Sequence, residues 1–326
     1  AFIRENRKVS IAEIRGFFGD AQKKITLLRD LDKLISEGKV LRQGQSRATV
    51  YAPAIDREEY FLIDPDKRIR KHDSFNFQIF QEIGDLFSAG ELADLDAANA
   101  QYRRNRNAAS PAILRKELER LTIEFSWKSS LIEGNTYTLL DTERLILHAR
   151  EAEGKKHEEA MMIVNHKKAL DFIFAQPGYF ERLSVAKIEE IHHLLVDGLG
   201  VAFGLRTTRV GIVGTAYRPL DNAFQIREAT ERLVSRINEL NHPVEKALLA
   251  VLMISYIQPF EDGNKRTARL IGDALLLANQ YCPLSYRSVD EIEYKKAVIL
   301  FYEQNDFRYF KQLFVEQFKQ AVKKYF

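Results

Sequence analysis

The chain has 326 residues, enough for two domains at roughly 150 residues each. Its 49 basic and 46 acidic side chains leave a formal net charge of +3, so the total charge points neither to nucleic acid nor to an acidic partner. The single cysteine, Cys282, excludes an internal disulfide, and no apolar run approaches the ~20 residues that cross a bilayer. These features predict a cytoplasmic protein without a membrane segment.

Residues 1–70 carry the pattern of a small α+β domain. A short helix is expected to end at Gly19, and apolar residues spaced by three and four predict a second helix that ends at Gly38. Two strands, 39–42 and 48–51, follow with a turn at Gly44. This order of two helices and a two-stranded wing resembles a winged-helix domain.

Two uses of such a domain are open from the sequence. Basic and polar side chains on the second helix and the wing could contact DNA: Lys23, Lys24, Arg29, Arg42, Gln43 and Arg47. Four acidic residues dilute this charge: Asp20, Asp30, Asp32 and Glu37. The alternative is a module that packs against another protein.

Residues 71–110 are charged and mixed, and we predict a helical linker with one helix around 75–87. From Pro111 to the end the pattern is helical, with Pro111 in the first turn of a helix. The exception is 206–220, where β-branched residues, glycines and a closing proline predict a short β-hairpin. The expected fold is therefore all-α with one hairpin, plus the small N-terminal α+β domain.

The stretch 258–269, Gln-Pro-Phe-Glu-Asp-Gly-Asn-Lys-Arg-Thr-Ala-Arg, has the chemistry of a phosphate site. Gly263 allows a ligand to approach the backbone closely, and the free N–H groups of the helix that starts near Asn264 attract anions. Arg266 and Arg269 lie on one face of that helix and can each bind phosphate oxygens. Asp262 can hold Mg²⁺, which prefers oxygen ligands and substrate phosphates.

This stretch closely resembles the signature loop of the Fic family, His-Pro-Phe-x-x-Gly-Asn-Gly-Arg-x-x-Arg, and the resemblance extends over about residues 110–310. The resemblance implies a Fic (Fido) helical core at 111–326 that transfers AMP from ATP to a Ser, Thr or Tyr hydroxyl of a target protein. It implies that Asp262 binds Mg²⁺, that Gly263 and Asn264 hold the α-phosphate, and that Arg266 holds the β- and γ-phosphates. It also implies that the hairpin at 206–220 is a flap that aligns the target backbone.

A second motif, Ser-Ser-Leu-Ile-Glu-Gly-Asn at 129–135, resembles the family's inhibitory motif, [Ser/Thr]-x-x-x-Glu-[Gly/Asn]. Ser129 and Glu133 lie four residues apart, on one face of the helix predicted at about 111–134. The resemblance implies that Glu133 pairs with Arg269 and blocks the ATP γ-phosphate, because carboxylate and phosphate compete for one guanidinium. We therefore expect self-inhibition within the chain.

The sequence departs from the signature at two positions. Gln258 stands where the family has the histidine that takes the proton from the attacking hydroxyl, and an amide has no useful basicity. Loss of a general base typically costs ~10²–10⁴-fold in rate. A residue changed to trap a complex, a naturally inactive relative and another base are the open explanations. Lys265 stands where the signature has glycine, as in the branch of the superfamily that transfers phosphate instead of AMP.

The sequence predicts a self-inhibited protein adenylyltransferase weakened by Gln258. Its ligands would be ATP and Mg²⁺, and Lys265 would stand beside the phosphates. One alternative is an inactive nucleotide-sensing regulator with a DNA- or protein-binding winged helix, and another is a Fic-type phosphotransferase. The sequence leaves open the target protein and whether the chain forms a homodimer.

Overall fold

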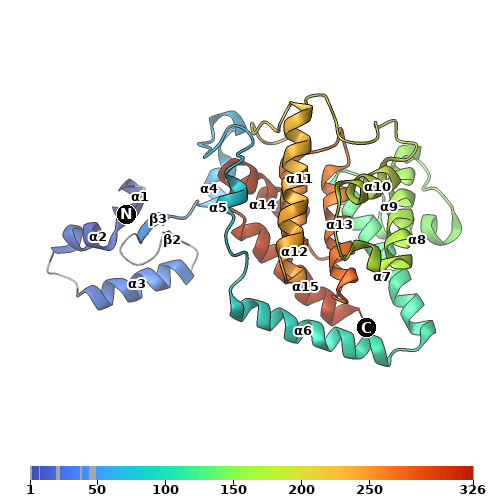
Figure 1. Cartoon of the computed structure of the whole chain (residues 1–326), viewed down its shortest axis with the longest axis horizontal. Coiled ribbons are helices and arrows are strands. Elements are labelled where there is room, and N and C mark those ends of the chain that lie inside the picture. Colours follow the sequence, from blue (N-terminus) through green and yellow to red (C-terminus); the bar gives the residue numbers. More distant parts are fainter. Residues whose placement is uncertain (1, 7, 20–22, 37–38, 44–48, 326) are drawn as a thin grey trace. The chain divides into compact units, whose positions relative to one another are not determined.

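The computed structural model describes residues 2–6, 8–19, 23–36, 39–43 and 49–325. The chain divides into two compact units, residues 1–69 and residues 70–326 (Figure 1). Each unit has its own hydrophobic core. None of the described helices is long and apolar enough to cross a membrane.

In its described residues, the first unit contains a three-stranded antiparallel sheet with helices. Its elements are α1 (Phe2–Asn6), β1 (Val9–Ser10), α2 (Ile11–Phe18), α3 (Lys24–Ser36), β2 (Val40–Gln43), β3 (Val50–Pro53) and α4 (Arg57–Leu62). The strand order is β1-β3-β2, with Val9 opposite Tyr51 and Arg42 opposite Tyr51 on the other side. The two helices and two strands follow one another as predicted, while β1 was not expected from the sequence.

The core of the first unit uses one apolar face of α3. Leu27 and Leu31, four residues apart, are buried with Ile14 of α2 against Val9 and Tyr51, whereas Ile25 of the same helix is 73% exposed. The turn predicted at Gly44, the side chain of Arg47 and the helix end at Gly38 lie outside the described residues. The winged-helix interpretation stays a prediction.

The second unit is almost entirely helical. Its helices are α5 (Ile79–Glu82), α6 (Ala89–Ala108), α7 (Pro111–Ile132), α8 (Leu139–His148), α9 (His157–Ala175), α10 (Val185–Val196), α11 (Ala223–Glu239), α12 (Pro243–Ile257), α13 (Asn264–Ala278), α14 (Glu291–Gln304) and α15 (Arg308–Lys324). As predicted, α7 begins at Pro111, and the Ser110 side chain accepts a hydrogen bond from the Ile113 amide as its N-cap.

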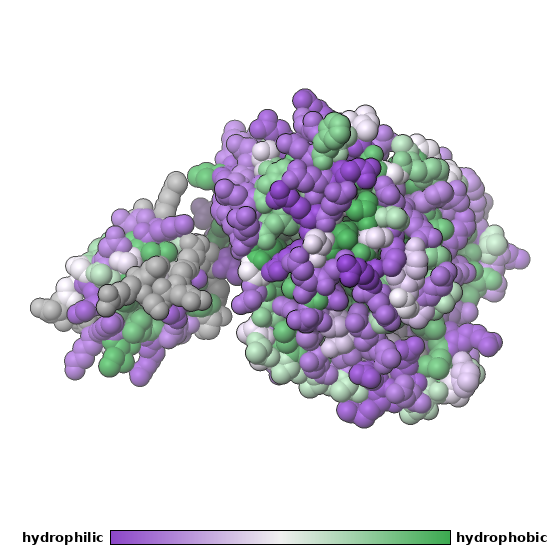
Figure 2. All heavy atoms as spheres, viewed as in Figure 1, coloured by the Kyte–Doolittle hydropathy of each residue, from purple (hydrophilic) through white to green (hydrophobic). Residues whose placement is uncertain are grey.

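Helices α12 and α13 form the centre of this unit. Figure 1 shows α13 between α12 on one side and α7, α9 and α10 on the other, and the contacts between elements agree. The two central helices approach closely at Gly272, where an added Cβ would lie 2.8 Å from Cγ2 of Val251. The surface that Figure 2 shows is largely hydrophilic, with apolar side chains scattered across it, so the apolar residues are mostly used inside.

The segment 71–110 is not a linker. Phe75, Ile79, Leu95 and Tyr102 are all buried in the core of the second unit, so the segment packs as part of that unit. The sequence missed this because α6 is polar on most of its surface and presents only a narrow apolar stripe.

The β-hairpin predicted at 206–220 is also wrong. No strand occurs there in the described residues, although Arg218 forms an isolated parallel bridge with Ser74. The amide of Phe75 donates to the Arg218 carbonyl, and the Arg218 amide donates to the Asp73 carbonyl. The β-branched residues therefore serve an extended segment whose backbone partner is the chain before α5.

Candidate functional site

A cavity of about 450 Å³ lies over the start of α13. One wall is the loop 258–264 with the first turn of α13, and a second wall is the segment 210–214, which turns at residues 213–214. Side chains of α14, among them Tyr294 and Tyr302, form a third wall. Glu133, the C-cap of α7, borders the same space. The volume is within the range of small-molecule sites.

The loop 258–264 is held by its own side chains. The Asn264 amide group donates to the Phe260 carbonyl and accepts from the Phe260 amide, both at 2.8 Å. Phe260 is fully buried in the hydrophobic core, so it anchors the loop there. Gly263 has φ 77°, a conformation that favours glycine, and an added Cβ would lie 3.2 Å from Val196. The sequence of the loop therefore specifies its shape locally.

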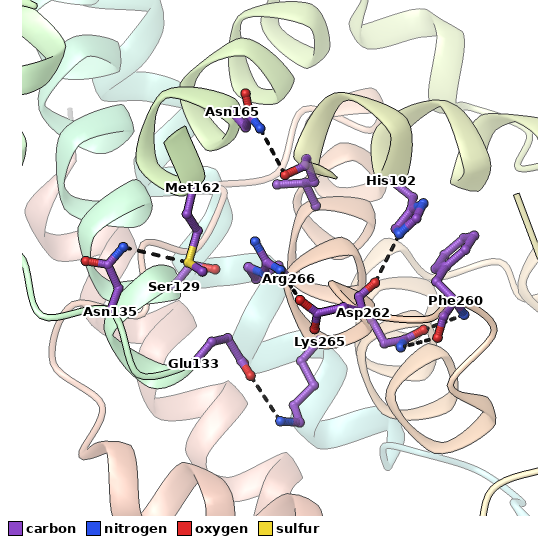
Figure 3. Close-up of polar contacts among 12 residues, drawn as sticks. Ser129, Glu133, Asn135, Met162, Asn165, His192, Phe260, Asp262, Lys265 and Arg266 are labelled. Carbon is purple, nitrogen blue, oxygen red and sulfur yellow. Dashed lines mark hydrogen bonds and ion pairs between the residues drawn. The ribbon is translucent and has the colours of Figure 1, made fainter. Parts of the chain in front are cut away.

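His192, in α10, packs against the loop. Its ring stacks on Phe260 with ring centroids 3.7 Å apart, and its Nε2 lies 3.0 Å from the Asp262 carbonyl (Figure 3). Burial lowers the pKa of His192 to about 4, so the ring is neutral near pH 7 and Nε2 donates. The neighbouring His193 is exposed and stacks on Phe203. His192 therefore holds the loop in place by stacking and by one hydrogen bond.

Arg266 presents an unpartnered donor beside the cavity. It is 2% exposed, and its Nη2 lies 3.0 Å from the Asp262 carboxylate (Figure 3). Its Nη1 is buried and has no hydrogen-bond partner. A buried unpaired guanidinium nitrogen costs free energy, which a bound anion would recover. The free N–H groups at the start of α13, which follow Gly263, add to this attraction.

Arg269, one turn further along α13, is fully buried and engaged on every nitrogen. Nε donates to the Ser129 hydroxyl at 2.9 Å, and Nη1 donates to the Tyr294 hydroxyl at 3.3 Å. Nη2 donates both to the Ser129 carbonyl at 2.8 Å and to Glu133 at 3.0 Å. Arg269 does not line the cavity, so the structure places it behind Glu133 rather than in contact with the open space.

Glu133 is shared by two cations. One carboxylate oxygen lies 3.0 Å from Nη2 of Arg269. The other lies 3.0 Å from Nζ of Lys265 (Figure 3). Burial alone would raise the pKa of Glu133, but the charges of Arg269 and Lys265 outweigh it and lower the pKa to about 2. The carboxylate is therefore ionised at neutral pH. The sequence predicted the contact with Arg269 and missed the one with Lys265.

Gln258 ends α12 in the left-handed region, with φ 52°. Its side-chain amide nitrogen donates to the Ser255 carbonyl at 2.6 Å. The side-chain oxygen is then the part of the amide left to accept a hydrogen bond, and Gln258 borders the cavity. The side chain can orient a hydroxyl but cannot remove its proton.

Arg206 is a structural residue that sequence reasoning missed. It is 3% exposed, and its guanidinium donates to the carbonyls of Gln258, Thr208 and Leu220, each at 2.6 Å. Its amide also donates to the Pro259 carbonyl at 2.9 Å. One side chain thus ties the 206–220 segment to the loop. Its sequence signal, a single arginine beside glycines, is too weak to identify this role.

Seven of the nine predicted site residues line one cavity, and the other two, Ser129 and Arg269, do not. Gln258, Asp262, Gly263, Asn264, Lys265, Arg266 and Glu133 all border it. Ser129 is fully buried and supports Arg269 from behind. The Asn264 side chain is occupied by Phe260, which leaves only its backbone for a ligand.

Residues 182–276 match the family model described as Fic/DOC family. Two similar curated proteins are both named Protein adenylyltransferase Fic. The one from Nematostella vectensis is 30% identical over 190 residues, which is 56% of this chain and 43% of that protein. The one from Drosophila willistoni is 30% identical over 196 residues, 59% of this chain and 39% of that protein. The chain therefore spans about two fifths of the length of these relatives.

Solved structures show the same fold. A fragment of Fic-1 from C. elegans has a TM-score of 0.61 at 21% identity, covering 72% of this chain and 70% of that one. A Fic family protein from Desulfovibrio desulfuricans G20 has a TM-score of 0.58 at 21% identity, covering 73% of this chain and 74% of that one. Residues 182–276, which include the signature-like loop, match the Fic/DOC family model, and the chain shares its helical fold with these solved Fic proteins.

Proposed function

We propose that the chain is a self-inhibited protein adenylyltransferase that transfers AMP from ATP to a Ser, Thr or Tyr hydroxyl of a target protein. The observation that carries the proposal is the unpartnered, buried Nη1 of Arg266 beside the start of α13 and a 450 Å³ cavity. A guanidinium and free helix N–H groups together bind phosphate. The names of the similar curated proteins support adenylyl transfer as the reaction.

The residues present suit a magnesium ion bound together with phosphates. The Asp262 side chain is 69% exposed and borders the cavity, so its carboxylate is accessible. Among the described residues no group of three His, Cys, Asp or Glu side chains could hold a metal ion. One carboxylate plus substrate oxygens is the usual arrangement for Mg²⁺, which would neutralise phosphate charge when bound. Asp262 would have to turn from Arg266, to which it is now paired.

Glu133 supplies the inhibition. Its carboxylate stands in the cavity between Lys265 and Arg269, where it would repel a phosphate and compete for the Lys265 ammonium. Lys265 is the more mobile partner, because its side chain is 25% exposed while Arg269 is fully buried. A nucleotide that enters would therefore draw Lys265 to its phosphates before it could draw Arg269.

The segment 210–214 offers the edge on which a target chain would align. The backbone amides of Val210, Gly211, Ile212 and Val213 donate to no other backbone group within the described part of the chain, and Val213 is 97% exposed. An extended peptide could add to this edge as a strand. This is the role expected of the flap, here taken by a segment without a hairpin.

Gln258 limits the rate. Its fixed amide can accept a hydrogen bond from the attacking hydroxyl, but it takes no proton at neutral pH. The proton would pass to a phosphate oxygen or to water, and we expect a loss of ~10²–10⁴-fold relative to a histidine there.

The test is intact-mass spectrometry after incubation with ATP and Mg²⁺. The variant Glu133→Gly is compared with Glu133→Gly/Gln258→His, and both with a control that also carries Arg266→Met. We expect added AMP in the histidine form, much less in the glutamine form and none in the control. A nucleotide-binding measurement on the same proteins covers the case of a strict foreign target. Absence of both AMP transfer and ATP binding in Glu133→Gly would sink the proposal.

Two other functions are each favoured by one observation. Gln258 favours a nucleotide-sensing regulator without catalysis, whose first unit would bind DNA or a protein. ATP binding without any modification product, together with a salt-dependent mobility shift on DNA, would support its DNA form. Lys265 favours phosphate transfer, which the same mass measurement distinguishes by the mass that is added.

A further inference from the structure

His166 lies in α9 behind the inhibitory residues, where it is fully buried and bonded at both ring nitrogens. Nε2 lies 2.9 Å from the Ser129 hydroxyl on α7. Nδ1 lies 2.9 Å from the Met162 carbonyl, one turn earlier on its own helix. The ring therefore connects α7 to α9 at the level of the cavity, and its two bonds define one chain of donors and acceptors.

Only one arrangement of protons satisfies this chain. A carbonyl only accepts, so Nδ1 of His166 carries the hydrogen, and Nε2 of the neutral ring is an acceptor. A guanidinium only donates, so the Ser129 oxygen accepts from Nε of Arg269 at 2.9 Å and gives its own hydrogen to Nε2 of His166. The sequence of donors is thus Arg269 to Ser129, Ser129 to His166, and His166 to Met162.

We propose that His166 is a positioning residue for the inhibitory contact: it fixes the Ser129 hydroxyl, and through it the Arg269 guanidinium that holds Glu133 in the cavity. Ser129 and Glu133 are one turn apart and both bind Arg269, so the orientation of Arg269 depends on both. With its hydroxyl hydrogen drawn to His166, Ser129 can present only lone pairs to Arg269. Without His166 that hydrogen has no acceptor and the hydroxyl is free to turn.

The electrostatic setting keeps the ring in the form that the chain requires. Burial, followed by the charge of Arg266, lowers the pKa of His166 to about 3. The ring is therefore neutral near pH 7, and Nε2 stays an acceptor there. The competing explanation is plain packing, because the ring also lies 5.9 Å from the ring of Phe125.

Two substitutions separate positioning from packing. His166→Phe keeps an aromatic ring beside Phe125 and loses both hydrogen bonds. His166→Gln can accept from Ser129 and donate to the Met162 carbonyl, so it can restore the chain. The first readout is the dissociation constant for ATP with Mg²⁺, measured in the wild-type chain and in the Glu133→Gln background; this readout rests on the proposed function.

We expect His166→Phe to tighten ATP binding about fivefold in the wild-type background, the factor of one net hydrogen bond, because Glu133 is then displaced more easily. In the Glu133→Gln background the same change should leave ATP binding unaltered, and His166→Gln should resemble wild type in both. Weaker binding by the same factor in both backgrounds would overturn the proposal in favour of packing.

The second readout needs no nucleotide. Urea unfolding midpoints of the wild type, His166→Phe, Glu133→Gln and the double variant form a double-mutant cycle. We expect Glu133→Gln to lower the midpoint less when His166 is already replaced, because the contact is already weakened. Additive shifts would overturn the proposal. If Glu133→Gln binds no ATP, the proposed function fails, while this cycle still decides the role of His166.

Discussion

Two walls of the cavity differ in how their backbones are held. One wall is the loop 258–264 between α12 and α13, and the other is the segment 210–214. The loop 258–264 closes on itself through Asn264 and Phe260 and rests on His192. The 210–214 segment has no backbone partner for the amides of residues 210–213 in the described structure, and in its middle Ile212 packs against the core.

The ends of that segment are fixed from elsewhere in the unit. Arg206 binds one end to the loop, and the Tyr217 hydroxyl donates to the Tyr256 carbonyl at 2.9 Å at the other. Thr215 donates to the buried Glu303 on α14 at 2.6 Å. The loop 258–264 thus bonds to itself as well as to distant residues, whereas the 210–214 segment is positioned by distant residues and leaves its backbone amides without backbone partners.

We expect the greatest loss of stability when Arg206, which connects the two walls, is replaced. Arg206→Met removes a buried guanidinium that serves three carbonyls, and we expect the free energy of unfolding to fall by about 3–5 kcal/mol. Urea unfolding measures this. Arg209→Met is the matched control, since its side chain is 84% exposed and should change stability by less than about 0.5 kcal/mol. Equal effects of the two variants would contradict the role assigned to Arg206.

The second prediction concerns the pH dependence of the free energy of unfolding, to which Glu133 contributes. The pKa of Glu133 is about 2 in the folded chain against an ordinary value of 4.5. Its ionisation therefore stabilises the fold above pH 4.5, and this stabilisation is lost as the pH falls from 4.5 through about 2. At pH 7 the contribution is about 3 kcal/mol at most.

Glu133→Gln should accordingly unfold more easily than wild type at pH 7 and approach it at pH 3. The same variant should bind ATP more tightly at pH 7, because the carboxylate no longer stands in the cavity. Unfolding curves at pH 7, 5 and 3 beside a nucleotide titration check both effects. A stability difference that stays constant with pH would show that Glu133 is not held by Arg269 and Lys265 as described.

The third prediction concerns the segment 210–214, where we expect the smallest change in stability. Gly214 has φ 85°, and an added Cβ would lie 3.4 Å from Cδ1 of Ile299, so Gly214→Ala should cost about 1 kcal/mol. Gly211, in the same segment, has an ordinary φ and open space around its Cα, so Gly211→Ala should be nearly neutral. Thermal unfolding of the pair measures the difference. A neutral Gly214→Ala would mean that this segment adjusts freely rather than being fixed at its end.

Features that depend on residues a few positions apart in the chain could be predicted from the sequence. The loop 258–264 follows from a glycine with positive φ and from an asparagine that bonds four residues back. The i, i+4 spacing on α7 places Ser129 and Glu133 on one face, and the predicted contact between Glu133 and Arg269 is present. The helical start at Pro111 is of the same local kind.

The contacts between residues far apart in the chain became visible only in the folded structure. Lys265 reaches Glu133 across 132 positions, and Arg206 reaches Gln258 across 52. The segment 206–220 pairs with the chain near Ser74 instead of with itself, and His166 bonds Ser129 from another helix. Local propensity cannot specify such contacts, because β-branched residues and glycines suit an extended edge as well as a hairpin, and the partner is chosen when the helices pack.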